Sequence, residues 1–196
     1  MNKFTASGKA AAFALLLLGS TATIAAETAP RIGDFSLLDA EGYFHQMSWY
    51  DDHKALVLLS YSNDDNQLST MLGAFSELRD NAGDSFEFFL IDSQGKRNRS
   101  DIAAAMAHAG ISLPVLMDDA QLVGEALGLS VSGEVVVFDP KRFSVIARGF
   151  GEQALPVVSE LLAALDHGAD TSSAVAAVLA TKPDAGGLLG QFLRYP

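Results

Sequence analysis

From residue 32 to residue 167, apolar runs alternate with stretches of helical spacing. ALVLLSY at 55–61 is a continuous apolar run, as expected for a strand buried on both faces, and FEFFLI at 86–91 is a second such run. Residues 66–81 have helical spacing, and their apolar side chains fall on one stripe: Leu68, Met71, Leu72, Phe75 and Leu78. Strand, helix and strand of these lengths predict a right-handed crossover between two parallel strands.

Shorter elements are expected in the second half of the chain. Residues 100–109 have helical spacing, with Ser100 as the expected N-cap. A short extended segment at 113–117 and a short helix at 119–127 follow it. A glycine comes directly after each of these two helices, where glycine commonly ends a helix.

Two antiparallel strand pairs are expected to enclose this pattern. Residues 32–49 predict an N-terminal pair around the turn Asp39-Ala40-Glu41-Gly42. EVVVFDPKRFSVIARG at 134–149 predicts a hairpin on the edge of a mainly parallel sheet, because proline suits the second position of a type I turn at 139–142. Residues 152–167 then predict a helix whose buried stripe is Val157, Val158, Leu161, Leu162 and Leu165.

The first residues have the layout of a secretory signal peptide. Two lysines without an acid precede an unbroken apolar run at 10–18, and small residues lead to Ala25 and Ala26. This run is too short to cross a hydrocarbon core, which needs roughly 20 apolar residues. We therefore expect residues 1–26 to be removed after Ala25 or Ala26, which would place the protein in the periplasm or outside the cell.

These boundaries predict one domain at 27–167 and a C-terminal extension at 168–196. The extension contains an expected helix at 172–180 and a glycine-containing break at 182–187. It ends in an apolar set that consists of Leu188, Leu189, Phe192, Leu193 and Tyr195. This end could fold back onto its own domain, or it could dock onto another exported protein.

Composition and charge limit the classes of partner that the protein is expected to bind. Hydrophobic residues make up 49% of the 196 residues, which is enough for a core. The net charge is −11, and losing Lys3 and Lys9 with the signal peptide leaves 11 basic against 24 acidic residues, a net charge of −13. Such a surface repels phosphate backbones and anionic lipid, so we expect neither nucleic-acid binding nor membrane insertion.

The chain contains no cysteine. It therefore cannot form disulfides, zinc-thiolate sites, iron–sulfur clusters or covalently attached haem of the c type. It also has no G-x-G-x-x-G motif and no phosphate-binding loop. We expect no cofactor.

Four stretches resemble a known family in their order. They are RIGDFSLLDAEGYFHQMSWY, YSNDDNQLSTM, LPVLMDDAQLVGEALGL and SGEVVVFDPKRFSVIARG, and they extend over about residues 30–166. Together they resemble the thioredoxin-like superfamily in its redoxin arrangement, the alkyl hydroperoxide reductase and thiol-specific antioxidant (AhpC/TSA) type. The resemblance implies an α/β thioredoxin-like fold with a central mixed sheet flanked by helices, an N-terminal strand pair and a C-terminal helical extension.

The chain departs from that family at its reactive site. By this resemblance Asp65 occupies the position of the attacking cysteine, and Gly133 occupies the position of a cis-proline that faces it. Peroxide reduction and disulfide exchange need a thiolate, so no catalytic residue can be transferred to this chain. Asp65 has a structural alternative as a helix cap, and Gly133 has one as a turn residue.

We therefore expect a non-catalytic binding or accessory module for an unidentified exported protein or peptide. The candidate surface consists of Asn63, Asp64, Asp65, Asn66, Ser132 and Gly133. An oxidoreductase or antioxidant, implied only by the resemblance, is one alternative. A metal-binding protein is another: Asp64, Asp65, Asp118 and Asp119 carry suitable oxygens, while the histidines at 45, 53, 108 and 167 lack metal-ligating spacing.

Overall fold

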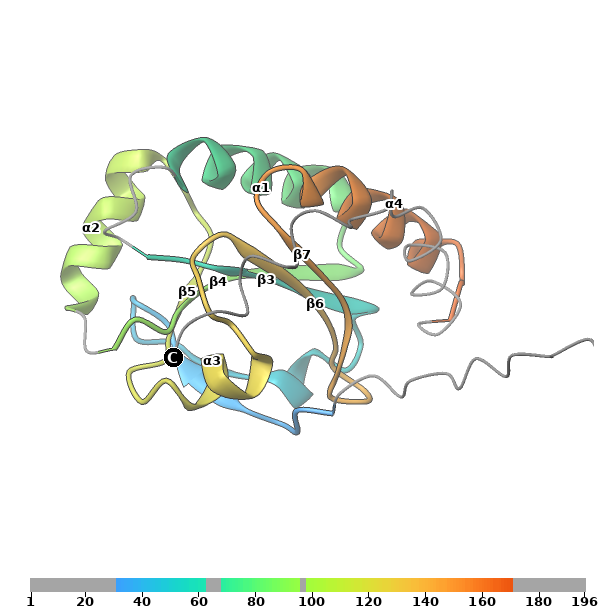
Figure 1. The fold of residues 1–196 in the computed structure, drawn as a ribbon, viewed down its shortest axis with the longest axis horizontal. Coiled ribbons are helices and arrows are strands. Elements are labelled where there is room, and N and C mark those ends of the chain that lie inside the picture. Colours follow the sequence, from blue (N-terminus) through green and yellow to red (C-terminus); the bar gives the residue numbers. More distant parts are fainter. Residues whose placement is uncertain (1–30, 63–67, 96–97, 171–196) are drawn as a thin grey trace, which may run out of the picture.

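The computed structural model describes residues 31–62, 68–95 and 98–170. The expected signal peptide and most of the expected extension lie outside this part of the chain, so the division into 1–26, 27–167 and 168–196 stays a prediction. At the centre is a five-stranded sheet of order β5-β4-β3-β6-β7 (Figure 1). Its strands are β3 (Ala55–Ser60), β4 (Phe86–Asp92), β5 (Val115–Met117), β6 (Glu134–Asp139) and β7 (Ser144–Phe150).

The sheet is mixed, as the sequence predicts. β3 pairs in parallel with β4, and β4 pairs in parallel with β5. Helix α1 (Leu68–Ala82) makes the expected crossover between β3 and β4. β6 and β7 form the expected hairpin, which adds antiparallel strands next to β3 and at the edge.

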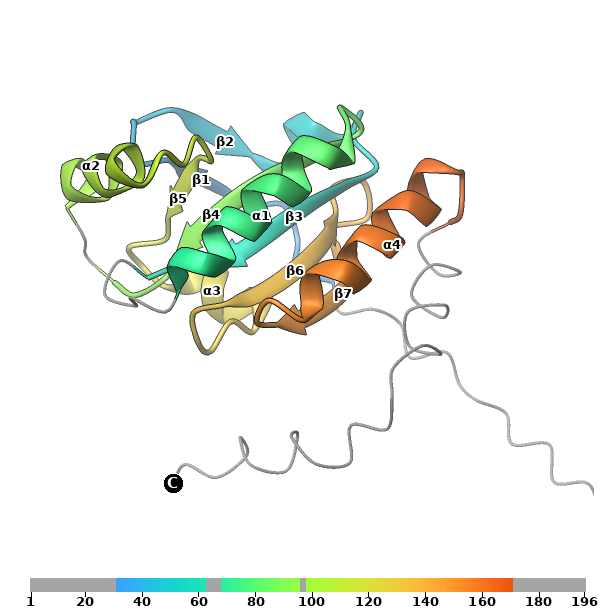
Figure 2. The ribbon, with the colours of Figure 1, turned by 90° about the horizontal axis from the view of Figure 1, so that it is seen from above.

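Helices cover both faces of the sheet (Figures 1 and 2). α1, α2 (Arg99–Ala109) and α4 (Ala154–Asp166) lie on one face, and α3 (Leu122–Leu127) lies on the other. Successive residues of β3 alternate between two apolar clusters, because strand side chains point to opposite faces in turn. The predicted stripe of α1 is buried in the first of these clusters.

The N-terminal strand pair lies on the same face as α3. β1 (Ser36–Leu38) and β2 (Phe44–Gln46) form the expected antiparallel pair around the turn at 39–42, and the short 3₁₀ helix η1 (Met47–Tyr50) follows. The backbone N–H of Ala40 donates to the carbonyl oxygen of Val115 at 2.9 Å, which fastens the turn to strand β5. The strand pair therefore covers the second apolar cluster, in which Met47 is fully buried.

Three local predictions were wrong. The N-cap of α2 is Asn98, whose side chain accepts from the backbone N–H of Ser100, so the helix begins at Arg99. α3 begins at Leu122 rather than at residue 119, after Gln121 with φ +60°. Val157 is 38% exposed, because α4 packs through Ala154, Leu155, Val158, Leu161, Leu162 and Leu165.

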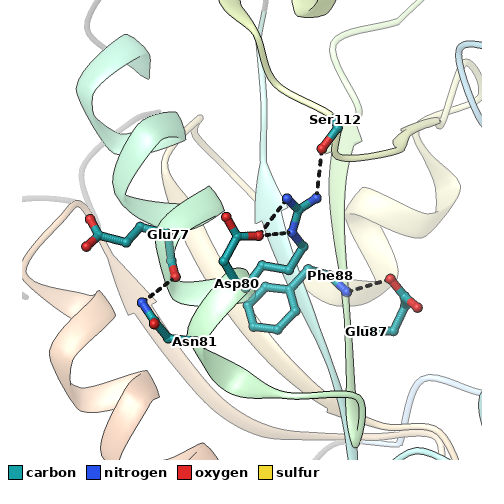
Figure 3. A network of polar contacts seen from close by, with 7 residues as sticks. Glu77, Asp80, Asn81, Glu87, Phe88 and Ser112 are labelled. Atoms are coloured by element: carbon teal, nitrogen blue, oxygen red, sulfur yellow. Dashed lines mark hydrogen bonds and ion pairs between the residues drawn. The ribbon is translucent and has the colours of Figure 1, made fainter.

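Polar contacts fix the end of α1 (Figure 3). Arg79 donates to the carboxylate of Asp80 at 2.7 Å and 2.9 Å and to the hydroxyl oxygen of Ser112 at 3.1 Å. Ser112 precedes β5, so the bond from Arg79 to Ser112 connects the helix to the loop that enters that strand. No helix among the described residues is long and apolar enough to cross a membrane.

Candidate functional site

Part of the predicted surface can be placed in the fold. Residues 63–66 lie outside the described residues, so the expected roles of Asn63, Asp64, Asp65 and Asn66 are not tested. Ser132 and Gly133 lie in the loop between α3 and β6. This loop lies at the end of the sheet where β3 ends, because β3 pairs antiparallel with β6 and the N–H of Gly133 donates to the carbonyl oxygen of Ser60.

Gly133 lies against two segments that are distant in sequence, helix α1 and strand β7. A β-carbon at this position would lie 3.6 Å from Leu68 Cδ2, 3.7 Å from Met71 Sδ and 3.7 Å from Phe150 Cε2. The loop therefore packs against the first described turn of α1 and the last residue of β7. These distances are ordinary contacts, so the requirement for glycine comes from its φ of +87°.

The backbone of Gly133 is already used within the fold. Its N–H donates to the carbonyl oxygen of Ser60 at 2.8 Å, and its carbonyl oxygen accepts from the N–H of Gly151 at 2.9 Å. No peptide bond among the described residues is cis. An extended peptide could not take the N–H of Gly133 as a main-chain donor, so recognition there would depend on neighbouring groups and on side chains.

Glu134 and Arg148 hold the loop in place. One carboxylate oxygen of Glu134 accepts from the backbone N–H of Ser130 at 2.7 Å, and the other lies 3.4 Å from the guanidinium of Arg148. Arg148 also donates to the carbonyl oxygens of Leu127 and Gly128 at the end of α3. A cation at a helix C-terminus is favourable, so one side chain on β7 connects α3, the loop and β6.

Two apolar side chains border Gly133 and face solvent. Val131 is 42% exposed, and Phe150 is 51% exposed. Together with Ser132 and Gly133 they form what we call the loop surface. The sequence prediction missed Val131 and Phe150, although strand alternation places Phe150 on the same side as Arg148, which is itself exposed.

The aspartate that ends β4 and the one that directly follows β5 accept hydrogen bonds within the fold. The Asp118 carboxylate accepts from the backbone N–H of Gly124 at 2.6 Å and from the Ser93 hydroxyl at 3.0 Å. The Asp92 carboxylate accepts from the backbone N–H of Gln94 at 2.9 Å. Asp119 is exposed. Within 31–62, 68–95 and 98–170, no three His, Asp or Glu side chains come together as a metal site.

His45 takes part in a half-buried chain of hydrogen bonds. Its Nε2 lies 2.9 Å from Asp39, and its Nδ1 lies 2.7 Å from the hydroxyl of Tyr50. The Asp39 carboxylate can only accept, so in the neutral ring Nε2 carries the hydrogen and the Tyr50 hydroxyl donates to Nδ1. Burial raises the pKa of Tyr50, and the charges of Glu87 and Asp39 raise it further, so the phenol stays protonated.

These hydrogen bonds stabilise the N-terminal strand pair and η1, and we assign them a structural role. The other carboxylate oxygen of Asp39 accepts from the N–H groups of Glu41 and Tyr43, at 3.0 Å and 2.8 Å, and thereby closes the turn between β1 and β2. His45 and Tyr50 both pack edge-on against Phe89 of β4, at ring-centroid distances of 5.2 Å and 5.3 Å.

A hollow of about 300 Å³ lies between α1 and α4. Its lining includes Glu77 and Asn81 on one side and Glu152 and Ser159 on the other. It is separate from the loop surface. The Asn81 amide is already bonded to the carbonyl oxygen of Glu77 at 2.8 Å (Figure 3), so we assign no reaction to this hollow.

Comparison with known proteins gives a result for the fold. No protein family matches the sequence, and no curated protein matches it. A hypothetical protein from Sinorhizobium meliloti 1021 has a similar structure, with a TM-score of 0.63 and 21% identity over 73% of this chain and 86% of its own.

Two further neighbours carry descriptive names. One is the exposed lipoprotein thioredoxin of Streptococcus pneumoniae, with a TM-score of 0.55 and 20% identity over 65% of this chain and 98% of its own. The other is a putative thiol:disulfide interchange protein DsbE from Chlorobium tepidum, with a TM-score of 0.59 and 14% identity over 71% and 98%. The chain therefore has a thioredoxin-like fold, as its sequence motifs predict.

Proposed function

We propose that the protein is an exported, non-catalytic binding or accessory module that holds another protein or peptide at its loop surface. The reactive chemistry of thiol–disulfide proteins is not open to it, because the chain has no cysteine. A carboxylate at position 65 cannot replace a thiolate, since it neither forms a disulfide nor passes through a sulfenic acid. The AhpC/TSA type of redoxin remains part of this proposal.

One observation carries the proposal: the end of the sheet where the family would place its reactive site presents exposed apolar side chains on a fixed loop and on the end of the neighbouring strand β7. Glu134 and Arg148 hold that loop, and Gly133 packs against α1 and β7. Phe150 and Val131 stay about half exposed beside it. An aromatic side chain on a preorganised surface is typical of the residues that carry most of the energy of a protein contact.

Export is the second part of the proposal. Its support is the layout of residues 1–26 in the sequence. The name of the pneumococcal neighbour, an exposed lipoprotein, is consistent with a thioredoxin-like fold outside the cytoplasm. Signal-peptide removal is tested by the mass of the purified protein, which should correspond to a chain that starts at Ala26 or Glu27.

The binding role is tested with Phe150→Asp. The processed protein is used as bait in its own periplasmic extract, the captured protein is identified and purified, and its Kd is measured by calorimetry. We expect Phe150→Asp to weaken binding by about tenfold or more, as for a central aromatic contact. Val157→Asp is the matched control, because it adds the same charge at a half-exposed valine on α4.

Equal affinities for wild type and Phe150→Asp would overturn the loop surface as the binding site. Equal loss in Phe150→Asp and Val157→Asp would point to the added charge alone and would also count against it. Turnover of peroxide or of a disulfide substrate above the buffer rate would overturn the non-catalytic assignment.

A further inference from the structure

A second apolar surface lies on the N-terminal strand pair and η1. Its members are Leu38, Tyr43, Phe44 and Trp49, which are 40%, 66%, 47% and 61% exposed. We call these four residues the aromatic surface. Leu38 and Phe44 are direct partners across β1 and β2, and the rings of Phe44 and Trp49 meet edge to face at a centroid distance of 5.2 Å. Leu38, Phe44 and Trp49 therefore form one continuous apolar group.

The aromatic surface is preformed. Strand alternation turns Phe44 outward and His45 inward, and η1 likewise turns Trp49 outward and Tyr50 inward. The inward pair is fixed by the hydrogen bonds to Asp39 and between the two rings. A partner would not have to order the strand pair before it binds, which lowers the entropy cost of binding.

Three exposed carboxylates border the aromatic surface, and one cation lies near it, since a β-carbon at Gly42 would be 3.8 Å from Arg99 Nη1. Glu41 lies in the turn before Tyr43, and Asp51 and Asp52 directly follow η1; all three are exposed. Exposed aromatic faces with nearby carboxylates favour a partner that brings both apolar side chains and a cation.

We propose that residues 188–195 of the same chain cover the aromatic surface. This segment, LLGQFLRY, carries Leu188, Leu189, Phe192 and Leu193 together with Arg194. In residues 171–196, Lys182 and Arg194 stand against Asp184, a net charge of +1, whereas the whole chain has a net charge of −11. The segment is therefore apolar like the aromatic surface, and its Arg194 is opposite in charge to the carboxylates beside that surface. The proposal is independent of the loop surface.

The end of the described chain lies within reach. The backbone carbonyl and the carboxylate of Asp166, at the end of α4, both accept from the Lys54 ammonium, at 2.9 Å and 2.6 Å. Lys54 follows Trp49 by only five residues. Figure 2 accordingly shows the end of α4 and the start of β3 at the same end of the molecule.

The connecting residues are long enough to pass from one face of the sheet to the other. Residues 171–187 could span roughly 55 Å when extended, at about 3.3 Å per residue. A domain of this size has a radius of gyration of about 15 Å, so the segment can reach the strand pair around the edge of the sheet.

Trp49 is the only tryptophan in the chain, so its fluorescence reports this contact directly. We compare the purified processed protein with a version that lacks residues 183–196. Deletion should shift Trp49 emission to the red and raise its quenching constant with acrylamide by roughly twofold, since about 60% of its surface is then open to solvent. A synthetic peptide of residues 186–196 added to the shortened protein should reverse both changes.

Point variants separate this contact from a loss of folding. Phe192→Ser in the full chain should reproduce the effect of deletion, while Gln191→Ser, the same change at the neighbouring polar position, should leave Trp49 protected. Circular dichroism confirms that each variant is folded.

Emission and quenching that are unchanged by deletion and by Phe192→Ser would overturn the proposal. Protection that disappears on dilution of the full chain would also overturn it, because an intrachain contact does not depend on protein concentration. Equal loss of Trp49 protection in Phe192→Ser and Gln191→Ser would show that the apolar side chain of Phe192 does not cause the protection, and it would also overturn the proposal.

Discussion

At the scale of single residues, Gly133 shows how one position can fix the backbone at the end of a strand. Its φ of +87° lies in the region that L side chains rarely adopt, and its N–H completes the hydrogen bonding at the end of β3. A proline here would lose that N–H and could not adopt this φ. This backbone conformation therefore favours glycine and excludes proline at position 133.

Replacing Gly133 by alanine should destabilise the protein by about 1–2 kcal/mol, because alanine is strained at the positive φ that glycine adopts freely. Gly73 is the matched control: it lies inside α1, is exposed, and a β-carbon there would have no neighbour within 4 Å. Gly73→Ala should stabilise by up to about 1 kcal/mol through helix propensity. Urea unfolding of both variants measures the difference, and a neutral Gly133→Ala would contradict the assigned strain.

At the scale of elements, the strands and helices predicted within the described residues are present near their predicted positions, and the errors concern helix ends and which side of a helix is buried. Asn98 caps α2 instead of Ser100, because both side chains suit the role and only the path of the loop decides between them. Val157 faces solvent because α4 packs with a stripe that begins at Ala154 and Leu155. The strand pair, the hairpin and the crossover needed no such correction.

The contact between α4 and the start of β3 predicts a dependence on pH. The hydrogen bond and the charge of Lys54 lower the pKa of Asp166 below its ordinary value of 3.8. A carboxyl whose pKa is lowered by folding stabilises above its unfolded pKa, and this contribution is lost as the pH falls through the folded pKa. Wild type should therefore have a higher Tm than Asp166→Asn near neutral pH, and the difference should shrink as the pH falls below 3.8 and vanish once the pH is below the lowered pKa of Asp166.

Lys54→Met tests the cause of that effect. It should lower the Tm near neutral pH in the same direction as Asp166→Asn, and the double variant should show little additional loss, because both changes remove the same pair. The effect should be small, since both side chains are partly exposed. A Tm difference between wild type and Asp166→Asn that is constant from about pH 7 to about pH 2 would contradict this assignment.

At the scale of the whole molecule, the protein has a thioredoxin-like fold and contains no cysteine, the residue on which thiol chemistry depends. Its core is divided by the sheet into two apolar clusters, and no disulfide contributes to its stability. Two sets of exposed apolar residues lie outside this core: the loop surface at one end of the sheet and the aromatic surface on the strand pair. Both include exposed aromatic side chains, and hydrogen bonds fix the backbone segments beside them.

The absence of thiols predicts indifference to redox conditions. The Tm in a strong thiol reductant should equal the Tm in an oxidising buffer, because no disulfide can form or break. Differential scanning calorimetry under both conditions measures this, with a thioredoxin-like protein that has its cysteine pair as the positive control. A shift in the transition with redox potential would mean that another oxidisable group controls stability.

The sequence by itself determined the chemistry that is excluded and the order of the elements. Composition decides the first, since no folding can supply a missing thiol, and backbone periodicity decides the second, since it is a local property. Only the tertiary structure decided that Leu68, Met71 and Phe150 meet at Gly133 and that Leu38, Phe44 and Trp49 face solvent. These features depend on how distant segments pack, and one stretch of sequence does not contain the direction from which another approaches it.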